Sequence, residues 1–195
     1  RDVVVAGAQI ALEAGADALV SLGGSSVVDM TKGVAMVLAE GADFDSLKVE
    51  SGNRLTAPKL PHVAIPTTLS AAEFTSAAGI TDPLTGVKEI FVSPMLAAKW
   101  VVLDAEMTVA TPQRLWAGTG MKLVADCLEG MLSARATRYS AALLQGALGI
   151  LLDDLGGSAD DLAARGRCLE AAHMTLSNLH NVGVGAVAAL RHQLG

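Results

Sequence analysis

Aromatic and basic residues are both scarce in this chain. Two tryptophans, one tyrosine and three phenylalanines are the only aromatic residues among 195, and 14 Lys and Arg against 20 Asp and Glu give a formal net charge of −6. The sequence also has no run of basic residues. Because nucleic-acid surfaces are basic and use aromatic rings for stacking, this composition argues against a nucleic-acid partner. A small anionic ligand would have to be bound in a local cradle.

Cysteine and long apolar runs are also lacking. Cys127 and Cys168 lie in helical patterns far apart in the sequence, which predicts neither a disulfide framework nor a CxxC metal site. No apolar stretch is long enough to cross a bilayer, and the first residues form no signal or transit peptide. We therefore expect a protein of the reducing cytoplasm without a membrane partner.

Hydrophobic residues make up 51% of the chain, which is enough for a sizeable core. Up to Asp104 helices and strands alternate, which favours a mainly parallel sheet, and after Thr111-Pro112, a predicted cap and first helical turn, the pattern is helical almost throughout. The expected helices are 2–14, 26–40, 112–134, 138–155, 158–177 and 181–194, and the expected strands are 17–22, 62–67, 89–93 and 100–104. The predicted fold class is α/β followed by all-α, with a partial Rossmann-like dinucleotide-binding domain over 1–107 and a partial helical-bundle domain over 108–195.

The most informative local pattern is an apolar strand that runs into Gly23-Gly24-Ser25-Ser26 and then into a helix. Glycines let a backbone approach a ligand closely, and the first turn of a helix favours a phosphate. Ser25 or Ser26 would cap the helix or donate a hydroxyl to that phosphate. The alternative is an ordinary strand–helix turn with a serine cap. Since ligands of open α/β sheets bind beyond the carboxyl ends of the strands, we expect this turn, the Thr67-Thr68 turn and the end of strand 100–104 to line one crevice.

Four ordered blocks resemble the iron-containing (group III) alcohol dehydrogenase family. Leu22–Lys32 is similar to its GGGSxxDxAK motif, with Ser25 in place of the third glycine, and Thr85–Lys88 and Val102–Thr108 resemble its TGxK and vlDpeLT segments. Ile65–Thr75 resembles its second nucleotide loop and is closest to the PTTLSGAEFT form of maleylacetate reductases. Family members are roughly twice as long as this chain, so it resembles an internal fragment of a dehydroquinate synthase-like, iron alcohol dehydrogenase-like fold.

The resemblance implies a nicotinamide dinucleotide, NAD(H) or NADP(H), as cofactor. Gly23, Gly24, Ser25 and Ser26 would hold its pyrophosphate, and Thr67, Thr68 and Ser70 would follow its phosphates and nicotinamide ribose. Lys88 would reach a ribose hydroxyl, and Leu103 would pack on the cofactor. Asp29, expected in the first helical turn, would either contact the cofactor or complement the helix dipole, and Lys88 could instead be a solvated loop lysine.

The metal site is where this sequence departs from the family. Its metal-dependent members use Asp and His in a G-M-D-x-x-x-H helix and two later histidines, whereas here the first three positions are Lys122, Asp126 and Ala188. An ammonium has no lone pair for a cation and repels one, so we expect no metal. Maleylacetate reductases resemble this chain in often placing a basic residue at the Lys122 position.

Lys122 and Asp126 share one helical face at i and i+4. Lys122 would hold an anionic keto acid or polarise its carbonyl, or it would form only an intrahelical ion pair with Asp126. His192 matches the family's histidine beside the nicotinamide and would donate a proton, unless it is a frayed surface residue.

The resemblance favours a homodimeric NAD(P)H-dependent reductase that acts without a metal on a small anionic substrate. Its reaction would be the reduction of an oxo-dicarboxylic acid such as maleylacetate to 3-oxoadipate in the degradation of aromatic compounds. The alternatives are a metal-dependent alcohol dehydrogenase of the same fold and a degenerate, non-catalytic family member.

Overall fold

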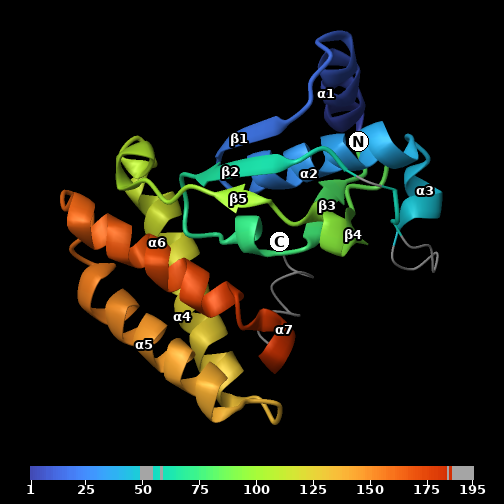
Figure 1. Ribbon diagram of the computed structural model, residues 1–195. Coiled ribbons are helices and arrows are strands. Elements are labelled where there is room, and N and C mark those ends of the chain that lie inside the picture. The colour runs from blue at the N-terminus through green and yellow to red at the C-terminus, as the bar shows by residue number, and fades with distance from the viewer. Residues whose placement is uncertain (49–54, 58, 184, 186–195) are drawn as a thin grey trace. The chain divides into compact units, whose positions relative to one another are not determined.

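The computed structural model describes residues 1–48, 55–57, 59–183 and 185, and it divides the chain into two compact units (Figure 1). Unit 1 consists of Arg1–Pro66 and Ala72–Val102, and unit 2 consists of Thr67–Ala71 and Leu103–Gly195. The polypeptide therefore enters unit 2 at Thr67, returns to unit 1 at Ala72, and enters unit 2 again after Val102.

Unit 1 is built on a three-stranded parallel sheet in the order β1-β2-β5, as the strand–helix alternation predicts. The pairing of β1 with β2 runs from Leu19↔His62 to Gly23↔Pro66, so both strands end at the same edge. The helix α2 packs against α1, β1 and β2 (Figure 1). The bounds of these elements are α1 Asp2–Glu13, β1 Leu19–Gly23, α2 Ser25–Glu40, β2 His62–Pro66 and β5 Trp100–Val101.

An antiparallel hairpin completes unit 1. Its strands are β3 (Ala77–Thr81) and β4 (Lys88–Val92), so the strand expected at 89–93 is present, whereas its partner β3 was not predicted. Three short 3-10 helices connect the elements of the chain around the hairpin and after β5, at Ala72–Phe74, Pro94–Leu96 and Ala105–Thr108.

The core of unit 1 lies between this hairpin and the helices. Phe91 of β4 and Met36 of α2 are fully buried in it. Phe91 meets Phe44, from the short helix α3 (Phe44–Leu47), edge to face, with ring centroids 5.9 Å apart. Two of the chain's three phenylalanines are therefore used to join the hairpin to the helical layer.

Unit 2 is a helical bundle in which α4, α5 and α6 pack against one another. The helices are α4 Gln113–Leu132, α5 Arg138–Asp154, α6 Leu162–Leu176 and α7 Leu179–Val182. The expected helices 112–134, 138–155 and 158–177 are present with shorter ends, and most of the expected helix 181–194 lies outside the described residues. None of the helices in the described part of the chain could span a membrane.

The start of α4 differs from the expected Thr111 cap. Pro112 is the N-cap residue, and no side chain caps the helix; Thr111 instead donates its hydroxyl to the carbonyl of Thr67 at 2.7 Å. Thr111 does not cap the helix because its hydroxyl is used in a tertiary contact: the loop Thr67–Ala71 belongs to the same unit and offers the Thr67 carbonyl as an acceptor. By contrast, α5 begins with a capping box in which Thr137 and Ser140 satisfy each other's amides.

A buried arginine joins the bundle to the segment that precedes it. Arg165 of α6 is 3% exposed and donates to the carbonyls of Ser158 and Thr108, each at 2.9 Å. Its guanidinium also lies 4.6 Å from the ring centroid of Trp116, whose indole donates to the Ser158 hydroxyl. The charge is thus accommodated by carbonyl oxygens and an aromatic face.

His62 connects the first two strands through a side chain. It is buried at the start of β2, and its Nε2 lies 2.7 Å from the Ser21 hydroxyl of β1. Among the described residues its Nδ1 has no hydrogen-bond partner. Burial, together with the nearby Lys32 charge, lowers the pKa of His62 to about 4.

This shift predicts an acid-sensitive fold. Between the ordinary histidine pKa of 6.5 and about 4, the unfolded chain binds a proton that the folded chain does not, so stability falls as the pH decreases. The loss attributable to His62 is at most about 1.4 kcal/mol per pH unit. We expect His62→Gln to flatten this slope in urea unfolding between pH 6.5 and 4. Equal slopes for the variant and the wild type would contradict the assignment.

Candidate functional site

The turn between β1 and α2 has the backbone geometry of a phosphate cradle. Gly24 is the N-cap of α2 with an extended backbone (φ −81°, ψ −171°), and no side chain caps the helix. The Val27 amide donates to the Gly24 carbonyl at 3.0 Å, whereas no side chain caps the amides of Ser25 and Ser26, and the positive end of the helix dipole lies beside them. The predicted serine cap is wrong, because Ser25 and Ser26 are already helical residues and only Gly24 occupies the cap position.

Gly23 is required at this turn by close packing. A Cβ placed on Gly23 would lie 2.7 Å from Cγ2 of Val27, in the first turn of α2. Any side chain at this position would push strand and helix apart. Gly23 therefore allows the strand to run directly into the helix N-terminus, where a diphosphate could bind to backbone amides.

Asp29 and Lys88 form an ion pair across unit 1. Asp29 lies in the second turn of α2, not the first as expected, and is 8% exposed. Its Oδ2 accepts the amide of Gly79 at 3.2 Å and lies 3.6 Å from Lys88 Nζ. Burial raises the pKa of Asp29, while Lys32 and Lys88 oppose this shift. The dipole explanation for Asp29 is therefore wrong, and Lys88 is the first residue of strand β4 rather than a loop residue, with a side chain that is 46% exposed.

Lys32 holds the segment that returns to unit 1 after the Thr67–Ala71 loop. It is 1% exposed, and its ammonium donates to the carbonyls of Ala72, Thr75 and Ala77 at 2.7, 2.8 and 2.8 Å. Burial lowers the pKa of Lys32 to about 8. The sequence analysis assigned no role to Lys32. The pattern that could have indicated one is its i+3 spacing from Asp29, which puts both side chains on one face of α2.

In unit 2, the loop that carries Thr67, Thr68 and Ser70 is held against α4. The Leu69 amide donates to the Thr119 hydroxyl at 3.1 Å, and Lys122 Nζ donates to the Ser70 carbonyl at 3.1 Å. Ala71, where the maleylacetate reductase pattern has glycine, adopts a positive φ of 60° and is fully buried. A non-glycine residue in this region stores strain, which indicates that the surrounding contacts fix the loop strongly.

Lys122 and Asp126 form the predicted i,i+4 ion pair on α4, with Lys122 Nζ 2.7 Å from Asp126 Oδ2. Their side chains are 22% and 13% exposed. The bonds to Asp126 and to the Ser70 carbonyl use two of the three donors of the ammonium, and within the described residues no further bond uses the third. Cys127, next in sequence, is buried with its Sγ 3.2 Å from the Thr175 hydroxyl, and burial raises its pKa, as expected for a small core residue.

The structure thus gathers the candidate residues into two sets. Gly23, Gly24, Ser25, Ser26, Asp29 and Lys88 lie in unit 1, and Thr67, Thr68, Ser70, Leu103 and Lys122 lie in unit 2. The turn at Gly23 and the end of β2 are adjacent through the Gly23↔Pro66 pairing. The remaining predicted catalytic residue, His192, lies outside the described residues.

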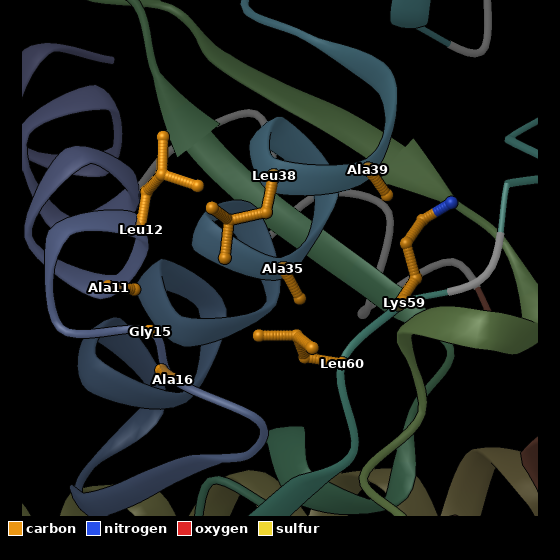
Figure 2. A pocket seen from close by; sticks show the side chains of 9 residues that line it. All are labelled: Ala11, Leu12, Gly15, Ala16, Ala35, Leu38, Ala39, Lys59 and Leu60. Carbon is orange, nitrogen blue, oxygen red and sulfur yellow. The ribbon is translucent and has the colours of Figure 1, made fainter.

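A separate apolar pocket of about 360 Å³ lies at the other end of α2 (Figure 2). It is lined by small and aliphatic side chains from the ends of α1 and α2, with Leu60 and Lys59 closing one side. Its α2 residues Ala35 and Ala39 are ten and fourteen residues after Ser25, a distance of about 15–20 Å along a helix. The Lys59 ammonium is paired with Glu40 at 2.6 Å. This pocket is therefore distinct from the phosphate cradle.

The family model for iron-containing alcohol dehydrogenase matches residues 1–105, more than half of the chain. The chain belongs to the iron-containing alcohol dehydrogenase family.

Among curated members of this family, the chain is 32% identical over 199 residues to the probable alcohol dehydrogenase EutG of Escherichia coli (strain K12), which covers 100% of this chain and 49% of EutG. It is 31% identical over 183 residues to the NAD-dependent methanol dehydrogenase of Bacillus methanolicus, covering 92% of this chain and 48% of that protein. The chain thus spans about half the length of these relatives.

Solved structures of the same family also match nearly all of this chain and about half of their own length. The alcohol dehydrogenase from Oenococcus oeni is 26% identical with a TM-score of 0.90, over 98% of this chain and 51% of that one. The maleylacetate reductase from Rhizobium sp. strain MTP-10005 is 25% identical with a TM-score of 0.79, over 98% of this chain and 49% of that one. The fold is therefore a partial iron-containing alcohol dehydrogenase fold, α/β and then helical.

The residues at the family's metal position do not fit a divalent ion. Lys122 offers no lone pair as an ammonium, and it occupies the Asp126 carboxylate that could otherwise be a ligand. Among the residues that the structure describes, no group of three or more His, Cys, Asp or Glu could hold a metal. Ala188, a further family ligand position, lies outside them.

The buried ammonium of Lys32 predicts a strong effect on stability. In Lys32→Met three buried carbonyls lose their cation and Asp29 keeps only Lys88 as a nearby positive charge, so we expect a loss of about 3 kcal/mol in the free energy of unfolding. Lys99→Met, at an exposed lysine of the same unit, is the control and should change stability by less than about 0.5 kcal/mol. Similar denaturation midpoints for the two variants would refute the role given to Lys32.

Proposed function

We propose that this protein is an NAD(P)H-dependent reductase of the metal-independent, maleylacetate reductase type, which reduces an oxo-dicarboxylic acid such as maleylacetate to 3-oxoadipate. The observation that carries this proposal is the Lys122 ammonium, held by Asp126 and the Ser70 carbonyl at the family's metal position. The solved maleylacetate reductase that overlays on 98% of this chain supports it. The same proposal includes a homodimer in the cytoplasm that acts in the breakdown of aromatic compounds.

The cofactor in this proposal is NAD(H) or NADP(H). The amides of the Gly24–Ser26 turn would hold its diphosphate, since no side chain of the protein caps them. Thr67, Thr68 and Ser70 would follow its phosphates and nicotinamide ribose, Lys88 would reach a ribose hydroxyl, and Leu103, which is 37% exposed, would pack on it. The bound dinucleotide supplies the hydride. One relative, from Bacillus methanolicus, is named as NAD-dependent.

Lys122 takes the electrostatic role that a metal has elsewhere in the family. Its remaining donor would bind a carboxylate or polarise the carbonyl of the keto acid, and its position is fixed before substrate arrives because Asp126 and Ser70 already hold it. His192 would donate the proton that balances the reduction.

The second candidate is a metal-dependent alcohol dehydrogenase, and the alcohol dehydrogenases among the relatives favour it. It requires the Asp126 carboxylate to leave Lys122 and bind the ion. A third possibility is a degenerate family member that no longer catalyses a reaction, because Ser25 and Asp126 depart from the family pattern.

The deciding experiment assays the full-length protein with maleylacetate and with simple alcohols, with and without a chelator. Activity on maleylacetate that survives chelation is the expected result. Stoichiometric iron or zinc and chelator-sensitive alcohol oxidation would instead establish the second candidate. NADH should quench the emission of Trp100 or Trp116 if the protein is either type of dehydrogenase. A degenerate family member that does not bind the cofactor would show no quenching.

The role of Lys122 predicts a selective loss of turnover. Lys122→Gln keeps a hydrogen-bond donor for Ser70 but removes the charge, so we expect kcat to fall about 100-fold while the unfolding midpoint changes little. Arg114→Gln removes one exposed positive charge from the same helix and should leave kcat within about twofold. If Lys122→Gln retains the wild-type kcat, Lys122 takes no part in the reaction.

A further inference from the structure

Gly79 lies where the hairpin and α2 meet. It pairs with Ile90 in the register of β3 and β4, two positions from the Thr81↔Lys88 pair. A Cβ on Gly79 would overlap Cε of Lys88, and it would lie 2.9 Å from Nζ and 3.1 Å from Cδ. The aliphatic stem of Lys88 therefore lies across the backbone of Gly79, in space that no other residue type leaves open.

The end of that side chain is held by Asp29. One carboxylate oxygen of Asp29 accepts the Gly79 amide at 3.2 Å and lies 3.6 Å from Lys88 Nζ. Asp29 thus fixes both the strand under the lysine and the ammonium at its tip. The Lys88 side chain is nevertheless 46% exposed, whereas Lys32, the other lysine near Asp29, is buried and engaged with three carbonyls. Only Lys88 of the two can meet a ligand.

We propose that Gly79 and Asp29 are positioning residues that hold the Lys88 ammonium one helical turn behind the phosphate cradle, ready for the dinucleotide. Asp29 is four residues after Ser25, so the carboxylate that holds Lys88 stands on the same helix as the cradle. This inference rests on the proposed function, because it assumes that the cradle takes a nicotinamide dinucleotide. Preorganisation of a long lysine side chain lowers the entropy cost of binding.

Gly79→Ala tests the proposal because it moves Lys88 while sparing the fold. The obstacle to the new methyl group is the flexible end of a side chain, and alanine is compatible with an extended strand backbone. We expect the Kd for NADH, measured by fluorescence titration of the full-length protein, to rise about tenfold, with kcat at saturating NADH and the unfolding midpoint nearly unchanged. Gly149→Ala, at an exposed helical glycine with no neighbouring atom, is the matched control.

A double-mutant cycle separates positioning from a general structural effect. Lys88→Met should weaken NADH binding by a similar factor, and Gly79→Ala should add nothing in the Lys88→Met background. Additive losses, or unchanged NADH binding by Gly79→Ala, would overturn the proposal while leaving the proposed function intact.

A second readout needs no cofactor. The carboxyl ¹³C titration of Asp29 should move to higher pH in both Gly79→Ala and Lys88→Met, because each removes the ammonium from it. An unchanged titration in Gly79→Ala overturns the claim that Gly79 holds Lys88 in place. If both variants show that titration shift but the wild-type protein binds no NADH, the proposed function is the part that fails.

Discussion

Ammonium groups that bind backbone carbonyls organise the part of the chain between β2 and β3. In unit 1, Lys32 binds three carbonyls of residues 72–77, and in unit 2, Lys122 binds the Ser70 carbonyl. This segment has only a short 3-10 helix of its own, and the Ala72 carbonyl also accepts bonds from the amide and hydroxyl of Thr75, so the Lys32 ammonium adds to a small set of local bonds. A lysine suits this task because one ammonium carries three donors that point in different directions. Within unit 2, the loop that bears Thr67, Thr68 and Ser70 is held near its start by Thr111 and near its end by Lys122.

The larger features of the fold could be predicted from local patterns. The strand into Gly23, the helix after it and the bundle helices follow from apolar periodicity and turn residues, and these act within a few residues of one another. The strand β3, with the sequence Ala77-Ala78-Gly79-Ile80-Thr81, gave no such signal, since alanine and glycine are poor strand formers. It is a strand because β4 pairs with it and because its buried residues face the core. Pairing of that kind is invisible to a local pattern.

The candidate site was predicted only as far as its motifs extend. The glycine turn and the Lys122–Asp126 pair follow from spacing, and the structure places both as predicted. The contacts of Lys32, Asp29 and Thr111 join residues about 40 to 50 positions apart. They could not be predicted, because the spacing of residues within one helix or strand carries no information about such distant pairs. The serine cap was wrong for a smaller reason: the helix starts one residue earlier than the cap rule assumed, at Ser25 itself.

Replacing a metal ligand by lysine changes which substrates a site can favour. A divalent ion has open coordination positions and can lower the pKa of a neutral hydroxyl bound to it, which suits an alcohol. An ammonium has no such position; it stabilises charge that the substrate already carries or develops at an oxygen within hydrogen-bond reach. Asp126 neutralises part of the Lys122 charge, so in the proposed reductase an anionic substrate would have to reach the third donor of the ammonium directly. This reasoning favours a carboxylate-bearing oxo acid over a simple alcohol.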